Sequence, residues 1–334
     1  MTPLPTRQKP IEITKLHPPG VRETILKMRS RDIASYVDPK TRRLKAQLCI
    51  RVLCPICEKD KTKLFFVKEG FEFVQCVECE LVYVNPQLKE EVVSSLYQQG
   101  RFDYSLKHLY LPSAEYRKER FFSERMDCID GYFPNRGRIL DIGSSTGHFL
   151  LEAFERGWEA CGVELNAFVA DYSRKTLGLT QIFTGPLEQA GFPSGHFEAV
   201  TMWDLLEHLS NPHLVLKEAV RVLKKGGILF VYVPNLESAE VYLCQERCEN
   251  FAGDVHLTYF TPKTLSRLLE KVGLEVIRTE THGLDVDHLI FNLKNFYPER
   301  RYDTSFLEDH KEMLQEIINR AQLGNNLRMF ARKK

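Results

Sequence analysis

The chain has 334 residues, a formal net charge of +1, 43% hydrophobic residues and 27% charged residues, values that are ordinary for a folded globular protein. Its longest purely apolar run, about six residues from Ile228 to Val233, is far shorter than the ~20 residues that span a bilayer. The first thirty residues lack the apolar stretch of a signal peptide. We therefore expect a cytoplasmic protein without a membrane span.

Positive charge is concentrated at the amino-terminal end. Residues 1–53 contain twelve Lys/Arg and four Asp/Glu, a local charge of +8, so the rest of the chain sums to −7. We interpret residues 1–49 as a basic arm, Pro-rich at its start and helical over 21–36. Such an arm can contact nucleic acid, an acidic surface or a partner subunit. The absence of interleaved aromatic residues and of an RNA motif favours a partly solvated helical arm.

Four of the nine cysteines form two closely spaced pairs. Cys54 and Cys57 form one C-x-x-C, and Cys76 and Cys79 form a second after an interval of 18 residues. Two such pairs supply the four thiolates of a tetrahedral Zn²⁺ site, whereas a redox dithiol needs only one pair. Because sulfur would fill every position, no position remains open for a reacting water. The spacing predicts a structural zinc ribbon over residues 50–87.

The remainder of the chain divides into a helical part and an alternating part. Residues 88–134 are predicted to form a helical linker or lid. From residue 135 to 334, short apolar strands alternate with amphipathic helices, which indicates a parallel sheet covered on both faces. Strands are predicted at 138–141, 160–164, 180–183, 197–202 and 228–233, and helices at 147–157, 167–176, 211–223 and 262–272. Strands at 274–280 and 325–331 complete seven, with residues 281–324 between them as an insertion containing its own helix.

A glycine-bearing loop follows the first of these strands. Asp141 ends the strand, Gly143 and Gly147 lie in the loop, and a helix begins at His148. Loops at the carboxyl edge of a parallel sheet are where open α/β folds bind ligands. The spacing does not fit the G-x-G-x-x-G of a dinucleotide site, and the next strand ends in Glu164, whose carboxylate can accept hydrogen bonds from two ribose hydroxyls. These features separate the loop from those of NAD-binding proteins.

Further motifs follow the predicted strands in a characteristic order. They are Leu140-Asp141-Ile142-Gly143, Gly162-Val163-Glu164, Trp203-Asp204-Leu205-Leu206-Glu207-His208-Leu209 and Leu223-Lys224-Lys225-Gly226-Gly227. With them, residues 138–332 resemble a class I methyltransferase that uses S-adenosylmethionine (SAM), of the type 11, 12 or 23 kind. With the ribbon included, residues 50–332 are similar to zinc-containing sugar methyltransferases. The chain departs from the family pattern at Ser145, where a glycine is usual.

The resemblance implies a Rossmann-like seven-stranded methyltransferase sheet preceded by the zinc ribbon and the helical lid. It also implies the residues that bind SAM. The methionine end would lie against the loop residues Asp141, Gly143, Ser145 and Gly147, and the ribose against Glu164. The adenine would be flanked by Leu187 and Glu188, and the transferable methyl group by Trp203 and Asp204.

The chemistry adds a requirement for the acceptor. Methyl transfer from a sulfonium is an in-line displacement in which orientation can supply ~7–11 kcal/mol, but a hydroxyl or carbon nucleophile also needs a base. Candidates are Glu207, His208 and His256, together with Asp285 or His288 in the insertion. Glu207 also fits an acid that interacts with a helix dipole, and His208 a structural role beside Trp203. A divalent ion held by Glu207 and His208 is an alternative, although two ligands do not define a site.

The sequence therefore predicts a SAM-dependent methyltransferase that acts on oxygen, nitrogen or carbon of a small acceptor. A sugar, a glycan precursor or a secondary metabolite is the favoured class. One alternative is an RNA or protein methyltransferase that docks through the ribbon and the basic arm, for which RNA retention would depend steeply on salt. A second alternative is a non-catalytic module that keeps SAM as a structural ligand. The oligomeric state is left open.

Overall fold

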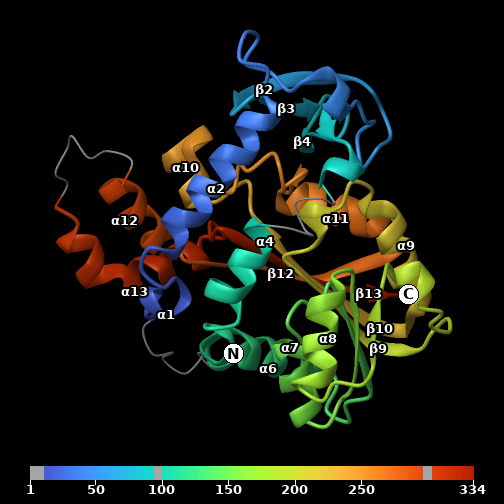
Figure 1. Ribbon diagram of the computed structural model, residues 1–334. Coiled ribbons are helices and arrows are strands. Elements are labelled where there is room, and N and C mark those ends of the chain that lie inside the picture. Colours follow the sequence, from blue (N-terminus) through green and yellow to red (C-terminus); the bar gives the residue numbers. More distant parts are fainter. Residues whose placement is uncertain (1–10, 94–99, 296–302) are drawn as a thin grey trace.

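The computed structural model describes residues 11–93, 100–295 and 303–334, and in these ranges a seven-stranded sheet forms the centre of the molecule (Figure 1). The strand order is β12-β13-β10-β9-β6-β7-β8. The parallel strands are β6 (Arg138–Ile142), β7 (Glu159–Glu164), β8 (Ile182–Thr184), β9 (Phe197–Trp203) and β10 (Leu223–Pro234). Strand β13 (Asn326–Lys333) is antiparallel to both β10 and β12 (Leu274–His282). The predicted Rossmann-like sheet is confirmed.

Helices cover both faces of this sheet because its strands carry apolar residues on both sides. Ala199 of β9 packs with α6 (Ser123–Tyr132), α7 (His148–Glu155) and α8 (Ala167–Lys175). Its neighbour Val200 packs with α9 (Pro212–Val222) and α11 (Pro262–Lys271) on the opposite face. Successive side chains of a strand point to opposite faces, so the continuous apolar runs of the sequence require a helical layer on each side.

The structure contains the predicted strands and helices of this domain, and their bounds agree with the prediction within a few residues. There are three differences. Strand β10 begins at Leu223, because this residue pairs with Phe197 before an irregularity that precedes Ile228. The insertion contains two helices, α12 (Asp285–Asn295) and α13 (Ser305–Arg320). A short helix, α10 (Ala239–Cys244), follows β10 where none was expected. Among the described residues, no helix combines the length and the apolar character needed to cross a membrane.

The predicted helical linker is only partly regular. It begins in strand β5 (Gln87–Leu88), which pairs with β1 (Cys49–Ile50). Residues 94–99 lie outside the described residues. The rest is α4 (Arg101–Ser105), α5 (Ala114–Arg117) and α6, joined by the wider turns η2 (Leu106–Tyr110) and η3 (Lys118–Phe122).

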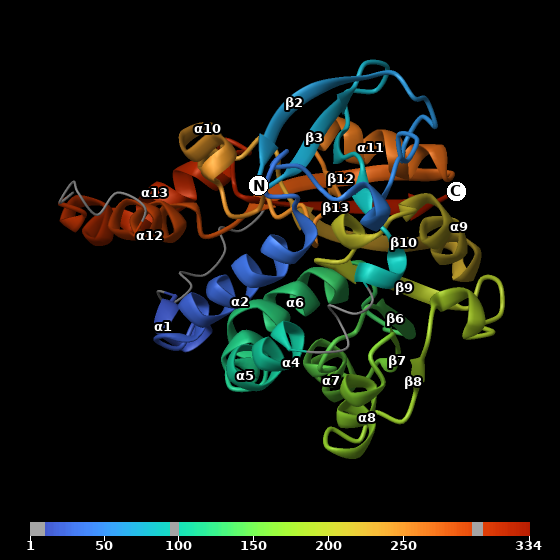
Figure 2. The same cartoon turned by 45° about the horizontal axis from the view of Figure 1, so that its top comes forward.

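The cysteine-bearing segment, residues 50–87, is built into the larger fold. Its strands β2 (Thr62–Lys68), β3 (Phe71–Cys76) and β4 (Val82–Val84) continue into β11 (Thr258–Tyr259), a strand that lies between α10 and α11 in the sequence. Tyr83 pairs with Thr258, and Val82 pairs with Tyr259. Figures 1 and 2 show this cysteine module beside α11. A two-residue strand has no periodicity, which is why the sequence did not predict the shared sheet.

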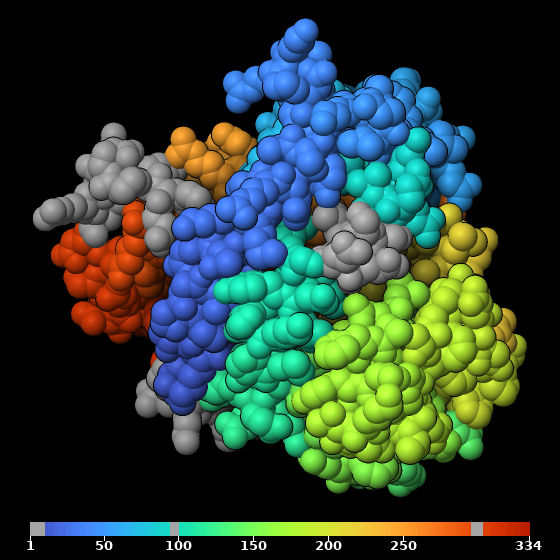
Figure 3. Space-filling view, viewed as in Figure 1, coloured from blue at the N-terminus to red at the C-terminus, as the bar shows by residue number. Residues whose placement is uncertain are grey.

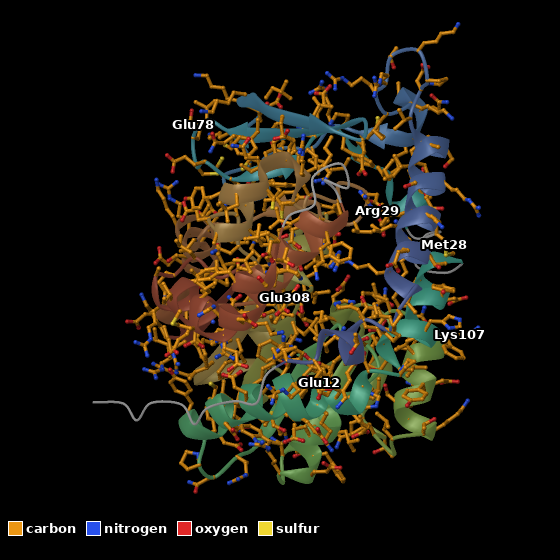
Figure 4. The ribbon with its side chains drawn as sticks, turned by 90° about the vertical axis from the view of Figure 1, so that its left-hand side faces the viewer. Glu12, Met28, Arg29, Glu78, Lys107 and Glu308 are labelled. Atoms are coloured by element: carbon orange, nitrogen blue, oxygen red, sulfur yellow. The ribbon has the colours of Figure 1, made fainter. Side chains whose placement is uncertain are left out.

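The described part of the basic arm lies across one face of the molecule (Figure 3) and consists mainly of α1 (Ile13–Leu16) and α2 (Val21–Tyr36). Arg29 lies on the side of α2 that faces the body of the protein (Figure 4). Its Nε donates to Asp254 Oδ1 over 2.9 Å, and Arg101 of α4 donates to Asp254 Oδ2 over 2.7 Å. The Asp254 side chain is fully buried. Part of the arm's charge is therefore used in ion pairs within the chain.

Replacing Asp254 by Asn should lower the free energy of unfolding by about 3–5 kcal/mol, because it leaves two largely buried guanidinium groups without their shared carboxylate. Urea denaturation measures this change. The matched control is Glu69→Gln, which removes the more exposed partner of Arg29 and should cost less than about 1 kcal/mol. Equal, small effects of the two substitutions would contradict this role for Asp254.

Candidate active site

The loop after β6 is held against β7 by backbone hydrogen bonds. The N–H groups of Gly143 and Ser144 donate to the carbonyl oxygen of Val163 over 2.8 and 3.0 Å. Gly143 and Gly147 adopt φ values of 76° and 78°, and Ser145 adopts 47°. A Cβ at Gly147 would lie 2.7 Å from the hydroxyl oxygen of Ser173 on α8, so a side chain has no room there. Ser145 takes the left-handed conformation itself, although its position in the family pattern is usually a glycine.

Glu164 closes the other side of this loop. Its Oε2 accepts the N–H of Ser145 over 2.9 Å and its Oε1 accepts the N–H of Asn166 over 2.8 Å. Burial raises the pKa of Glu164. A carboxylate has about four acceptor positions, so both oxygens keep capacity to accept ligand hydroxyls. The predicted ribose-binding residue therefore lies directly beside the glycine loop.

Asp141 is fixed from the neighbouring strand. The hydroxyl of Thr201 on β9 donates to Asp141 Oδ1 over 2.6 Å, and burial raises the pKa of Asp141 to about 7. Thr201 was not predicted, because a threonine within an apolar strand carries no motif. Asp141, the loop and Glu164 thus form one continuous site at the carboxyl edge of β6 and β7.

Of the two residues predicted beside the methyl group, Trp203 is the last residue of β9 and Asp204 follows it. Asp204 has a φ of 51°, and its N–H donates to the carbonyl of Tyr232 over 2.9 Å. Arg125 of α6 covers this corner, with its guanidinium 4.4 Å from the ring of Trp203 and 4.6 Å from the ring of Tyr232. One of its nitrogens lies 4.0 Å from the Asp204 carboxylate. Arg125 was not predicted, because a single arginine in a charged helix gives no signal.

The two residues expected at the adenine follow β8. Leu187 begins the short turn η4 (Leu187–Gln189), and its side chain is buried in the core, whereas Glu188 is exposed. Two residues earlier, the N–H of Gly185 donates to the carbonyl of Glu164 over 3.0 Å. Gly185, two residues before the start of η4, therefore contacts Glu164, the residue predicted to bind the ribose.

The three catalytic candidates converge, although 48 positions separate the two histidines. Glu207 and His208 lie in the turn η5 (Leu206–His208) after β9, and His256 lies just before β11. The rings of His208 and His256 are 4.8 Å apart, and His208 Nε2 is 3.8 Å from Glu207 Oε1. One ligand atom from each of the three residues lies within 4.8 Å of the others. We call these three residues, each a predicted candidate for the catalytic base, the catalytic cluster.

Glu207 is the most deeply buried member of the catalytic cluster, and the two histidines are partly buried. Glu207 is 1% exposed, and in the described structure neither carboxylate oxygen has a hydrogen-bond partner. Burial, with a contribution from Asp204, raises the pKa of Glu207 well above its usual range. Burial also lowers the pKa of His208 to about 3 and lowers the pKa of His256. Both imidazoles are therefore neutral at neutral pH.

Asp285 and His288, the other two candidates, belong to a separate hydrogen-bonded group. His288 Nδ1 lies 2.9 Å from Glu240 Oε2. Asp285 Oδ2 accepts hydrogen bonds from Gln315 Nε2 and from the Asn325 N–H, each over 2.9 Å. Both side chains thus have partners within the insertion and its neighbours.

The four paired cysteines also come together. Cys54 Sγ is 3.3 Å from Cys79 Sγ, Cys57 Sγ is 3.4 Å from Cys76 Sγ, and all four sulfurs lie within 4.8 Å of one another. Zn–S bonds of about 2.3 Å place the sulfurs of a tetrahedral site about 3.8 Å apart, a distance within this range. The four sulfurs can therefore hold a metal ion.

Helix α11 carries a row of basic side chains that contact the two cysteine turns. Lys271 donates to the carbonyl of Ile56 over 2.6 Å, Arg267 donates to the carbonyl of Cys79 over 3.2 Å, and Lys263 pairs with Glu80. The three residues are spaced at four-residue intervals and thus lie on one side of the helix. This spacing is visible in the sequence, but the partners of the three residues are 183, 188 and 215 positions earlier.

Comparison with known proteins agrees with this geometry. A family model described as "Methyltransferase domain" matches residues 113–279, which is half of the chain. The chain is also 30% identical over 188 residues to the ubiquinone biosynthesis O-methyltransferase of Chromobacterium violaceum, covering 51% of this chain and 79% of that protein. The chain belongs to the methyltransferase domain family. The enzyme is therefore a SAM-dependent methyltransferase.

The names of the similar proteins give more than one acceptor. The methyltransferase is 28% identical over 195 residues to the ubiquinone biosynthesis O-methyltransferase of Idiomarina loihiensis, covering 53% of this chain and 75% of that protein. It is 30% identical over 155 residues to the tRNA U34 carboxymethyltransferase of Syntrophotalea carbinolica, covering 43% and 47%. Among solved structures, a SAM dependent methyltransferase from Archaeoglobus fulgidus has 22% identity and a TM-score of 0.48, with 70% of this chain and 100% of that chain covered.

We expect Glu164→Ala to weaken SAM binding to the methyltransferase by ~1.5–3 kcal/mol, because the ribose hydroxyls would lose a charged acceptor. Isothermal titration calorimetry measures the affinity. Glu159→Ala is the control, since Glu159 begins the same strand at the opposite edge and pairs with Arg138. If the Glu164 variant bound SAM with wild-type affinity, this carboxylate would not be part of the SAM site.

Proposed function

We propose that this methyltransferase moves the methyl group of SAM to a hydroxyl oxygen of a small acceptor, with a sugar, a glycan precursor or a secondary metabolite as the favoured class. The observation that carries the proposal is the position of the catalytic cluster, which follows β9 immediately after Trp203 and Asp204. Two relatives whose names specify O-methyltransferases support oxygen as the attacked atom.

The segment that leads into the cluster lies beside the glycine loop. A Cβ at Gly143 would lie 3.0 Å from the side chain of Leu205, the residue between Asp204 and the turn η5. An acceptor hydroxyl held by the cluster would therefore face the methionine end of SAM. Oxygen attacks the methyl carbon, the carbon–sulfur bond breaks, S-adenosylhomocysteine leaves, and the hydroxyl proton passes to the cluster. Alignment of the reactants supplies most of the rate acceleration. Removal of the proton supplies a further ~10²–10⁴-fold.

Helices α4 to α6 and the cysteine module are proposed to cover the acceptor. Arg125 already lies over Trp203 and Tyr232, which places α6 above the corner where the methyl group is expected. Arg117 of α5 is partly buried, and burial lowers its pKa. This cover is an arrangement suited to a small molecule rather than to an extended polymer.

An RNA acceptor is the second candidate, because one relative is named for tRNA. The structure supports it less well. Arg22 and Arg29 of the basic arm pair with Glu249 and Asp254 within the same chain, so they are not free to contact phosphate. Retention of RNA that falls steeply with salt would favour this candidate.

Alanine at His208 or His256 should reduce turnover by at least ~10²-fold and leave SAM affinity unchanged, because the acceptor would lose the group that takes its proton. Turnover is followed with labelled SAM in a screen of hydroxylated acceptors, and SAM affinity by calorimetry on the same preparations. His310→Ala, an exposed histidine on α13, is the control. Near-wild-type turnover in both single variants and in the double variant would refute the role of the cluster.

We also propose that the four cysteines hold a structural Zn²⁺ ion. A set of four thiolates is the chemistry of a closed zinc site, and Cys54, Cys76 and Cys79 are buried. Hydrogen bonding from Cys54 lowers the pKa of Cys79. The basic row on α11 offsets the negative charge of a tetrathiolate centre.

Replacing Cys76 by Ser should release the zinc and unfold the cysteine module, because small modules of this kind depend on the ion for folding. Metal analysis of protein purified without chelators should find about one zinc per chain at the cysteines, and circular dichroism should report the loss of strand structure. Cys49→Ser, in the neighbouring strand, should retain the metal. Wild-type protein free of zinc would disprove the site.

A further inference from the structure

We infer that a cavity between the cysteine module and α10 binds an organic cation with an apolar stem, the chemistry shared by an arginine side chain and a free alkylguanidine. The cavity has a volume of about 640 Å³, which lies within the range of ~300–1,000 Å³ that is usual for ligand pockets. The cation is a ligand additional to SAM and to the acceptor, so the inference goes beyond the proposed function.

The cavity lies where two parts of the chain meet. One wall consists of residues from β2, β3 and β4 of the cysteine module, and the other consists of α10 with the residues just before and after it (Figure 1). Phe251, which also lines the cavity, belongs to the segment that carries His256. Boundaries between modules are common positions for ligand sites.

The floor of the cavity is apolar. The rings of Phe66 and Phe251 meet edge to face, with their centroids 4.8 Å apart. The aliphatic stem of a ligand that enters this region leaves water, which is favourable. The lining residues that form the floor are buried or partly buried, namely Phe66, Val82, Leu236, Val241 and Phe251.

Two further aromatic side chains line the opening. Phe65 comes from β2 and Tyr242 from α10, and they are 45% and 61% exposed. The face of an aromatic ring attracts a cation through its quadrupole, and a planar guanidinium group also stacks on it. The two rings therefore offer a surface for a cationic group at the mouth of an apolar floor.

The charge of the lining is negative. Three carboxylates, those of Glu80, Glu237 and Glu246, and one ammonium group, that of Lys263, give a charge of −2. Lys263 pairs with Glu80. Within the described part of the chain, Glu237 and Glu246 have no ion-pair partner. Two carboxylates thus remain to pair with a ligand of positive charge.

The hydrogen-bonding character of these groups separates a cation from a neutral sugar. Carboxylates only accept hydrogen bonds, and the Gln75 side chain donates its Nε2 to the carbonyl of Glu80 over 3.2 Å, which leaves its oxygen as an acceptor. Guanidinium and ammonium groups only donate. A sugar hydroxyl both donates and accepts, and it gains nothing from the net charge. The lining therefore favours a cation.

The backbone at the end of α10 supports a ligand site. Gln245 has a φ of 50° and a ψ of −133°, and a positive φ is uncommon for residues other than glycine. Gln245 and Glu246 follow α10 directly, and both line the cavity. Unfavourable conformations of this kind persist where the surrounding structure holds them, and they are concentrated at functional sites.

Calorimetric titration with butylguanidinium, and with a blocked tripeptide that contains one arginine, tests the cavity. The double variant Glu237→Gln/Glu246→Gln should weaken binding of both by ~10-fold or more, because two charged acceptors are lost. Phe65→Leu keeps an apolar side chain but removes the ring, and should weaken binding by ~2–5-fold. Glu275→Gln and Phe154→Leu, at exposed positions elsewhere, should bind like the wild type.

The two ligands distinguish the sources of the cation. Tighter binding of the tripeptide would identify an arginine of a protein partner, and equal affinity would identify a free alkylguanidine. Circular dichroism and SAM affinity establish that each variant is folded.

Three results would overturn the inference. They are no binding of either cation, equal affinity in the wild type and the double glutamate variant, and binding of neutral maltotriose in place of the cations. None of them affects the proposed function, because methyl transfer is measured separately and does not use this cavity.

Discussion

The pairing of β11 with β4 is the contact on which the arrangement of this enzyme depends. It joins a strand of the catalytic part to the sheet of the cysteine module through two residue pairs. The same short stretch of chain carries His256 and, two residues earlier, the buried Asp254 that binds arginines from α2 and α4. The cysteine module, the basic arm and the catalytic cluster are therefore positioned by one segment, residues 250–259.

Electrostatics reinforce this connection at two places. On one side, the basic row of α11 contacts the cysteine turns, where thiolates and carbonyl oxygens are concentrated. On the other, Asp254 draws two guanidinium groups into the interior beside the loop of His256. The excess positive charge of the amino-terminal region is thus matched in part by acidic groups of the rest of the chain, as in the pairs Arg29–Asp254 and Arg22–Glu249.

Much of the central domain was predictable because its signals are local. Asp141, the glycine loop and Glu164 each follow a buried strand, and parallel strands bring their carboxyl ends to one edge, so the motifs converge as expected. Glu207, His208 and His256 were selected from the same rule, because they follow the fourth and fifth strands of the sheet. The pairing of the strand after His256 with the cysteine module was not predictable, since β11 has only two residues. Arg125 and Thr201 carry no sequence signal, because their roles arise only from packing.

The shared sheet has a consequence for how the chain is made. Tyr83 pairs with Thr258, which is 175 residues later in the sequence. A ribosome therefore releases the cysteines and strands β2 to β4 long before it releases β11. During that interval, β4 remains an edge strand with unpaired backbone groups, a feature that folded proteins usually protect. Long-range pairings of this kind also form slowly. The module that comes first in the sequence is thus completed only after most of the catalytic domain has been synthesised, and an amino-terminal fragment ending before β11 would expose this edge.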